Sequence, residues 1–184
     1  MNPSTAEIVA AIDAADAPEV VVLPNNSNVI LSAEQAAEHA TKPARVVPTS
    51  SIPAGIAAAV VYDASRSAEE NAAEMAEALA AVATGAVTVA SRDVELDGLA
   101  VRKGDWLALS DGDPIGGGQD FEQAASLAVG RLLAEPRGVL TILTGEDAPP
   151  LNGLLEWIAA EHPDLEVEVQ EGGQPHYHLL LSAE

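Results

Sequence analysis

The stretch that decides the fold class is EVVVLPNNSNVILSAEQAAEHA, residues 19–40. Its continuous apolar run at 19–23 is typical of a short strand buried in a parallel sheet. A polar turn follows at 24–28, and residues 29–40 contain good helix formers with no internal Gly or Pro. A buried strand, a turn and a helix in this order predict an α/β fold.

The same alternation continues on both sides of this stretch. We expect helices over 6–15, 53–62 and 67–83, and a strand over 44–47. Ser4 or Thr5 is the expected N-cap of the first helix. Ser67, with Glu70 three residues later, predicts a capping box at the start of the 67–83 helix. Gly85 is expected to end that helix.

Residues 86–115 have a different character. Expected strands over 87–90, 94–101 and 106–109, with turns at 97–98 and 103–104, predict an antiparallel β meander. The glycine run 116–118 predicts a flexible joint. After it we expect helices over 119–134 and 150–161, and strands over 138–144, 165–169 and 176–182. The sequence thus predicts an α/β lobe over 1–85, a joining meander over 86–115 and a second α/β lobe over 116–184, with mostly parallel or mixed sheets.

Composition excludes several classes of function. The 184 residues include 29 Asp and Glu against 8 Lys and Arg, a formal net charge of −21, which argues against binding nucleic acid or anionic lipid. The absence of cysteine excludes disulfides, thiol catalysis and thiolate metal sites. No apolar run approaches the ~18 residues of a membrane span, and the N-terminus lacks the features of a signal peptide. We therefore expect a cytoplasmic protein without membrane insertion.

The turn after the first strand is the most informative candidate site. Asn25, Asn26, Ser27 and Asn28 lie between a strand and a helix N-terminus, where open α/β sheets bind ligands. Asn and Ser side chains here can hydrogen-bond a carboxylate or phosphate, or contact a partner. The same residue types commonly do no more than cap a helix. Both interpretations remain open at this point.

Other polar groups favour ordinary structural roles. Asp111 and Asp113 flank Gly112 at the expected tip of a hairpin, where Asp-Gly is common turn chemistry. His176 and His178 would lie on one face of a strand, but a zinc site needs a third protein ligand, and none is found at matching spacing. The sequence lacks a phosphate-binding glycine motif and a nucleophile elbow. We predict no catalytic residue and no metal site in this chain.

Longer motifs are spread along the whole chain. They are Met1-Asn-Pro-Ser-Thr5, Val22-Leu-Pro-Asn-Asn-Ser-Asn28, Val47-Pro-Thr-Ser-Ser-Ile-Pro53, Gly55-Ile-Ala57, Thr84-Gly85, Asp97-Gly98, Lys103-Gly-Asp105, and Gly172-Gly-Gln-Pro175 ahead of Tyr177. In this order and spacing, the chain resembles the C-terminal domain of the ATP-binding subunit of bacterial fatty acid kinases, the dihydroxyacetone-kinase-like proteins. That domain is itself similar to DegV-like proteins.

The resemblance implies a fold and a set of site residues. It implies two DegV-like (EDD-type) α/β lobes, the first related to the dihydroxyacetone kinase fold. In DegV-like proteins a Thr-Ser-x-Pro-Ser loop and a Ser-rich loop hold the carboxylate of a fatty acid. Here Pro3 and Ser4 match the end of the first loop, while residues 25–28 occupy the second, with Asn where the binders carry Ser and Gly. Ser4 therefore joins Asn25, Asn26, Ser27 and Asn28 as a candidate for binding a ligand or partner.

The resemblance also implies a function. In the relatives further domains precede the position of Met1, and they carry the ATP and Mg²⁺ residues, so we expect no cofactor on this chain. The leading hypothesis is a non-catalytic domain, joined to the rest of the kinase polypeptide, that helps dock the fatty-acid-binding DegV-like protein for acyl phosphate formation. The alternative is a DegV-type protein that binds a small ligand, a fatty acid or another anion. A kinase or phosphatase acting alone has no supporting motif.

Overall fold

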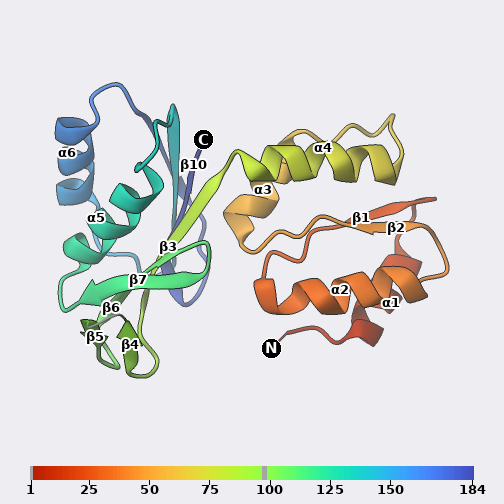
Figure 1. Cartoon of the computed structure of the whole chain (residues 1–184), viewed down its shortest axis with the longest axis horizontal. Coiled ribbons are helices and arrows are strands. Elements are labelled where there is room, and N and C mark those ends of the chain that lie inside the picture. Colours follow the sequence, from red (N-terminus) through yellow and green to blue (C-terminus); the bar gives the residue numbers. More distant parts are fainter. Residues whose placement is uncertain (1, 97–98) are drawn as a thin grey trace. The chain divides into compact units, whose positions relative to one another are not determined.

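The computed structural model describes residues 2–96 and 99–184, and it divides the chain into two compact units (Figure 1). Unit 1 covers Met1–Val82, and unit 2 covers Ala83–Glu184. Each unit has its own strands, its own helices and its own clusters of buried apolar residues.

Unit 1 is a small α/β layer structure. Its elements are α1 (Thr5–Ala14), β1 (Val20–Val22), α2 (Ser27–His39), β2 (Ala44–Val46), α3 (Ile52–Val60) and α4 (Ala68–Ala80). β1 and β2 pair in parallel, with Val20 opposite Ala44 and Val22 opposite Val46. The predicted parallel strand at 19–23 is therefore confirmed, together with the helices on either side of it.

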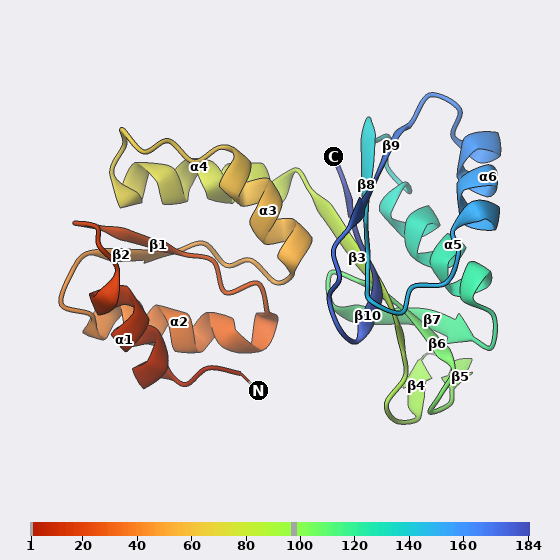
Figure 2. The ribbon, with the colours of Figure 1, turned by 180° about the vertical axis from the view of Figure 1, so that it is seen from behind.

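The three valines of β1 contact helices on both faces of the β1-β2 sheet. Val20 and Val22 pack in a cluster with Ile8 and Ile12 of α1 and with residues of α2. Val21, which points to the opposite face, packs in a second cluster with residues of α3 and α4. The backbone trace from behind shows α1 and α2 on one side of the strands and α4 on the other (Figure 2). A strand with helices on both faces needs the uninterrupted apolar run that the sequence has, and the three valines of β1 are half-buried.

Unit 2 is built on one mixed sheet. Its elements are β3 (Ala83–Val89), β4 (Val94–Leu96), β5 (Leu99–Val101), β6 (Trp106–Ser110), β7 (Asp113–Gly118), α5 (Phe121–Leu132), β8 (Val139–Thr144), α6 (Asn152–Glu161), β9 (Glu166–Glu171) and β10 (Tyr177–Ala183). The six-stranded sheet has the order β7-β6-β3-β10-β8-β9, and β4 and β5 form a separate hairpin. In the six-stranded sheet β8 and β9 pair in parallel, and the other neighbours are antiparallel.

The main core of unit 2 lies between this sheet and the two helices α5 and α6. Leu140, Ile142, Leu179 and Leu181 point from the central strands into a cluster with buried residues of both helices. Alanines of α5 are part of this cluster, so the helix can approach the sheet closely. A core of aliphatic residues and alanine suits a chain in which only 3% of the residues are aromatic.

The division of the chain differs from the predicted one. The expected joining meander does contain antiparallel strands, but β3 and β6 lie inside the sheet of unit 2, where β3 pairs with β10 from the C-terminus. The chain therefore divides between Val82 and Ala83, before the meander. The predicted turn at 97–98 lies outside the described residues.

Two glycine predictions are wrong. Gly85 does not end a helix, because α4 ends at Ala80 and Gly85 lies inside β3. The glycine run 116–118 is no flexible joint, because it belongs to β7 and pairs with β6. In both places glycine permits a close approach. A Cβ on Gly85 would lie 2.7 Å from Cδ1 of Leu132, and a Cβ on Gly117 would lie 3.1 Å from the carbonyl carbon of Trp106.

In the described part of the chain, no helix is both long enough and apolar enough to cross a membrane.

Candidate functional site

The carboxyl ends of β1 and β2 bring two loops to one edge of unit 1. β1 ends at Val22 and α2 begins at Ser27, while β2 ends at Val46 and α3 begins at Ile52. Because the strands are parallel, the loops 23–26 and 47–51 leave the sheet at the same edge. Ligands of open α/β sheets bind at this kind of edge. We call these two loops, together with the first residues of α2 and α3, the carboxyl edge.

Asn25 and Thr49 join the two loops of the carboxyl edge. The backbone N–H of Asn25 donates to Oγ1 of Thr49 at 3.0 Å, and this hydroxyl donates to Oδ1 of Asn25 at 2.8 Å. Thr49 is completely buried, so these bonds satisfy a hydroxyl that water does not reach. Asn25 has a φ of 54°, in the left-handed region that Asn tolerates better than most residues. The pair therefore fixes the shape of the loop.

Gly55 in α3 makes room for the Asn25 side chain. A Cβ on Gly55 would lie 2.7 Å from Cγ of Asn25, closer than real Cβ contacts allow. The glycine within the motif at 55–57 is therefore explained by close packing against the neighbouring loop.

Asn26 caps α2, as the structural interpretation of this loop predicted. Its φ and ψ are extended, and its Oδ1 accepts a hydrogen bond from the backbone N–H of Asn28 at 2.9 Å. Ser51 has the same role for α3, since its hydroxyl accepts from the N–H of Ala54 at 3.3 Å. Each cap satisfies one of the free N–H groups that begin a helix.

Ser27 and Asn28 differ from their neighbours, because their side chains are exposed and make no hydrogen bond with any other residue that the structure describes. They present a hydroxyl and an amide beside the N-terminus of α2, where a partial positive charge favours an acceptor. Of the four candidate residues in this loop, Asn25 and Asn26 thus have structural contacts, and Ser27 and Asn28 are available to a ligand or partner.

The fifth candidate, Ser4, has a different role. It is the N-cap of α1, and it forms a capping box with Glu7: its hydroxyl accepts from the N–H of Glu7, and its own N–H donates to the Glu7 carboxylate at 2.8 Å. The backbone N–H and the hydroxyl of Ser4 both donate to the Glu7 carboxylate, and these two bonds hold the pKa of Glu7 below its usual value. The next residue, Thr5, contacts Gln35 in the middle of α2. Ser4 thus caps α1, and its role in binding a ligand or partner stays a prediction.

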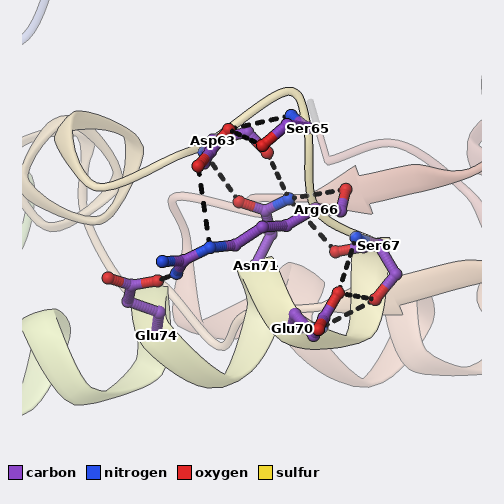
Figure 3. A network of polar contacts seen from close by, with 7 residues as sticks. All are labelled: Asp63, Ser65, Arg66, Ser67, Glu70, Asn71 and Glu74. Atoms are coloured by element: carbon purple, nitrogen blue, oxygen red, sulfur yellow. Dashed lines mark hydrogen bonds and ion pairs between the residues drawn. The ribbon is translucent and has the colours of Figure 1, made fainter.

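A separate polar network holds the segment between α3 and α4 (Figure 3). The buried Asn71 accepts from the N–H of Asp63 at 2.8 Å and donates to the carbonyl oxygens of Asp63, Arg66 and Ser67. Arg66 forms ion pairs with Asp63 and Glu74 around it. The predicted capping box of Ser67 and Glu70 is confirmed beside the network. Because the Asn71 amide is fully used inside the loop, this network is a structural element of unit 1.

Unit 2 contains a surface cleft that sequence reasoning did not find. Its volume is about 700 Å³, within the usual range for small-ligand sites. Leu107, Leu109 and Pro114 contribute apolar walls, while Arg92 and His176 contribute polar ones. A hydrogen bond from Thr88 Oγ1 to the carbonyl oxygen of His176, 2.6 Å long, joins two of the segments that line the cleft. Four segments distant in sequence line this cleft, so no local pattern could indicate it.

The remaining polar candidates have structural positions. Asp111 and Gly112 both have positive φ and form the tight turn between β6 and β7, as predicted for the hairpin tip. The Asp111 carboxylate accepts from Oγ1 of Thr84 at 2.9 Å. β10 begins at Tyr177, and His176 precedes it with a φ of 71°, so the expected strand alternation does not extend to His176. Among the described residues no three His, Asp or Glu side chains are placed to hold a metal ion.

Each of the two units thus has an α/β fold: unit 1 is a small parallel layer, unit 2 is a mixed sheet, and each has its own helices. A DegV family protein from Corynebacterium glutamicum has this fold, with a TM-score of 0.66 and 17% identity, covering 99% of this chain and 83% of that one. The dihydroxyacetone kinase of C. freundii also matches, with a TM-score of 0.62 and 16% identity over 98% of this chain and 41% of that one.

The chain belongs to the FakA-like family of fatty acid kinase C-terminal domains, whose model matches residues 1–184. A protein of Staphylococcus haemolyticus is 41% identical over 186 residues, which include all of this chain and 34% of that protein. The chain thus spans about one third of the length of the curated relatives it matches. The Streptococcus pneumoniae fatty acid kinase B3 protein, solved with linoleic acid, matches in fold with a TM-score of 0.65 and 13% identity, over 99% of this chain and 76% of that one.

Proposed function

We propose that this chain is a non-catalytic part of a fatty acid kinase and that it docks a separate DegV-like protein carrying the fatty acid. Docking would present the acyl carboxylate to ATP, which is bound by another part of the kinase polypeptide, for acyl phosphate formation. The observation that carries the proposal is the family match over the whole chain. We also propose that the protein acts in the cytoplasm, without nucleic acid and without insertion into a membrane.

The chemistry of the described residues supports a role without catalysis. A kinase site needs carboxylates that hold Mg²⁺ and backbone groups that surround the phosphates. Asp111, in the turn before the glycine run, is instead bonded to Thr84, and the glycines themselves are paired in β7. These contacts, among the described residues, support the proposal that ATP and Mg²⁺ bind elsewhere in the kinase.

The carboxyl edge supports a role in binding a protein. Its loops are fixed by the hydrogen bonds between Asn25 and the buried Thr49, so an approaching partner meets a formed surface. Ser27 and Asn28 offer neutral hydrogen-bonding groups there, which suit contacts at the border of a protein interface.

A second candidate function is the binding of a small ligand by the chain itself. The volume of the cleft in unit 2, about 700 Å³, and its apolar walls favour it; Arg92 supplies a cation to the lining, beside the carboxylates of Glu146 and Asp147. This candidate would make the chain a DegV-type binder of a fatty acid or another anion.

Isothermal titration separates the two candidates. The 184-residue chain is titrated in turn with palmitate, with ATP and Mg²⁺, and with a purified DegV-family fatty-acid-binding protein from the same genome. The proposal predicts binding to the protein and no heat from ATP with Mg²⁺. If the chain binds palmitate but not the DegV-family protein, the docking proposal is rejected and the second candidate function is favoured.

A further inference from the structure

Two stretches of unit 1 carry no charged residue. They are residues 20–33 and 46–62, in a chain where one residue in five is charged. At that frequency the 17 residues of the second stretch would be expected to contain about three charges. Both stretches lead into the carboxyl edge, the first through β1 and the start of α2, the second through β2 and α3. Depletion of charge over exposed surface is typical of the centre of a protein interface.

The helix α3 has an apolar side that faces outward. Ile52, Ile56 and Val60 are 43%, 50% and 79% exposed. Their spacing of four residues places them on one side of the helix, and we call them the α3 stripe. The other side of the same helix is formed by Pro53, Ala54, Gly55 and Ala58, all of them buried. Packing within unit 1 thus accounts for one side of α3 and leaves the α3 stripe unexplained.

Position links the α3 stripe to the carboxyl edge. Ile52 directly follows Ser51, the N-cap of α3, and Ser51 belongs to the loop that Thr49 fixes. Tyr62, just beyond the helix, is also exposed and extends the apolar surface at the far end. Large apolar side chains grouped on an exposed surface and bordered by polar groups are characteristic of contact sites between proteins.

We propose that the α3 stripe is the surface on which the fatty-acid-binding DegV-like protein docks. This inference rests on the proposed function and names the site for it. The stripe would insert into an apolar patch of the partner, with Ser27 and Asn28 of the carboxyl edge near its border.

The net charge of the chain favours a different protein, rather than a second copy of the chain, as the partner that docks on the α3 stripe. Unit 1 contains 11 Asp and Glu side chains and three Lys or Arg, and the whole chain has a formal net charge of −21. Two copies meeting at an uncharged stripe would bring two strongly acidic bodies together, which repel each other. A different protein can instead surround its apolar patch with Lys and Arg, which attract the acidic rim. The partner surface that fits is therefore apolar at its centre and basic around it.

The test uses charge substitutions that the fold tolerates. Ile56→Glu and Val60→Glu place a carboxylate in the centre of the proposed contact, on positions exposed in the free protein. Ile56→Lys introduces the opposite charge. A loss of affinity with both Glu and Lys at position 56 would therefore show that this side chain is buried in the complex. Leu127→Glu on α5 is the matched control, because Leu127 is a similarly exposed apolar residue of unit 2.

Affinity is measured by titrating each 184-residue chain with the DegV-family protein of the same genome, loaded with palmitate. We expect Kd to rise at least about tenfold for all three α3 variants and less than about twofold for Leu127→Glu, with thermal midpoints close to wild type. If the wild-type chain binds and the α3 variants have the same Kd, the α3 stripe is not the docking surface, while the proposed docking function still stands. A wild-type chain that does not bind would instead reject the proposed function itself.

Self-association is measured on the same samples by analytical ultracentrifugation. The inference predicts that wild type and the α3 variants are equally monomeric. A wild-type dimer that Ile56→Glu dissociates would overturn it in favour of a second copy on the stripe.

Discussion

Replacing Thr49 by Val tests how the carboxyl edge is built. The two side chains have nearly the same shape, so the substitution leaves no cavity at a completely buried position. It does remove the hydroxyl that accepts from the N–H of Asn25 at 3.0 Å and donates to Oδ1 of Asn25 at 2.8 Å. The loop before α2 then loses its attachment to the loop before α3.

The size of the effect follows from these two bonds. A hydrogen bond within a protein contributes about 0.5–1.5 kcal/mol net, and a buried group left without a partner costs about 1–3 kcal/mol. Asn25 is half-buried, so water can replace part of what it loses. We expect Thr49→Val to lower the free energy of unfolding of unit 1 by about 2 kcal/mol.

The assay is urea unfolding followed by circular dichroism, with wild type and variant compared at equal m-value. For an m-value of about 1–2 kcal/mol/M, the midpoint falls by about 1–2 M. Ser50→Ala is the control, since among the described residues the neighbouring Ser50 side chain forms no hydrogen bond, and its effect should stay within about 0.5 kcal/mol.

A double-mutant cycle assigns the effect to the pair. Asn25→Gly removes the amide and still permits the φ of 54°. If the two side chains interact as described, the double variant is less destabilised than the sum of the single variants, by at least about 0.5 kcal/mol. Additive effects, or a Thr49→Val midpoint equal to that of wild type, would refute this account of the loop.

Four further predictions concern other features of the chain. Asn26→Ala should destabilise unit 1 by about 1 kcal/mol in urea unfolding, because it removes the cap of α2. Hydrogen bonds from the backbone N–H and hydroxyl of Ser67 lower the pKa of Glu70 from its usual 4.5, so the stabilising effect of the carboxylate is complete above pH 4.5. The stability difference between wild type and Glu70→Gln should therefore be present at pH 7 and shrink as the pH falls below 4.5. The thermal midpoint should rise between low salt and 0.1 M salt, where the Debye length is about 10 Å, because the net charge of −21 repels itself. The chain should release no phosphate from ATP above a heat-treated control, and Asp111→Asn with Asp113→Asn should leave that background unchanged.

Local chemistry made much of unit 1 predictable from sequence. The capping box of Ser67 and Glu70 and the cap by Asn26 depend on residues within three positions of each other, so the sequence pattern contains all of the interacting groups. The parallel pairing of β1 was predicted from its uninterrupted run of valines, which helices cover on both faces. The structure confirms these elements with shifts of a few residues at their ends.

Contacts between distant residues were not predictable in this way. Thr49 lies 24 positions from Asn25, and only the pairing of β1 with β2 brings the two together. Gly85 and Gly117 resemble turn residues in sequence, yet they serve close packing inside the sheet of unit 2. The C-terminal strand β10 lies between β3 and β8 in the sheet. The predicted meander therefore belongs to unit 2, and the boundary between the units lies before it. Ser4 was grouped with the loop at 25–28 by resemblance, and that grouping stays a prediction; the structure adds the cap that Ser4 forms with Glu7.

The most direct test of the account compares two affinities for the same DegV-family fatty-acid-binding protein, loaded with palmitate. One is the affinity of the 184-residue chain, and the other is that of the whole fatty acid kinase polypeptide from the same organism, both measured by isothermal titration at 0.1 M salt. If this chain is the docking part, the two Kd values agree within about threefold. A whole kinase that binds tightly, beside a folded chain whose Kd is a hundredfold weaker or more, would contradict the central claim and place docking elsewhere in the kinase.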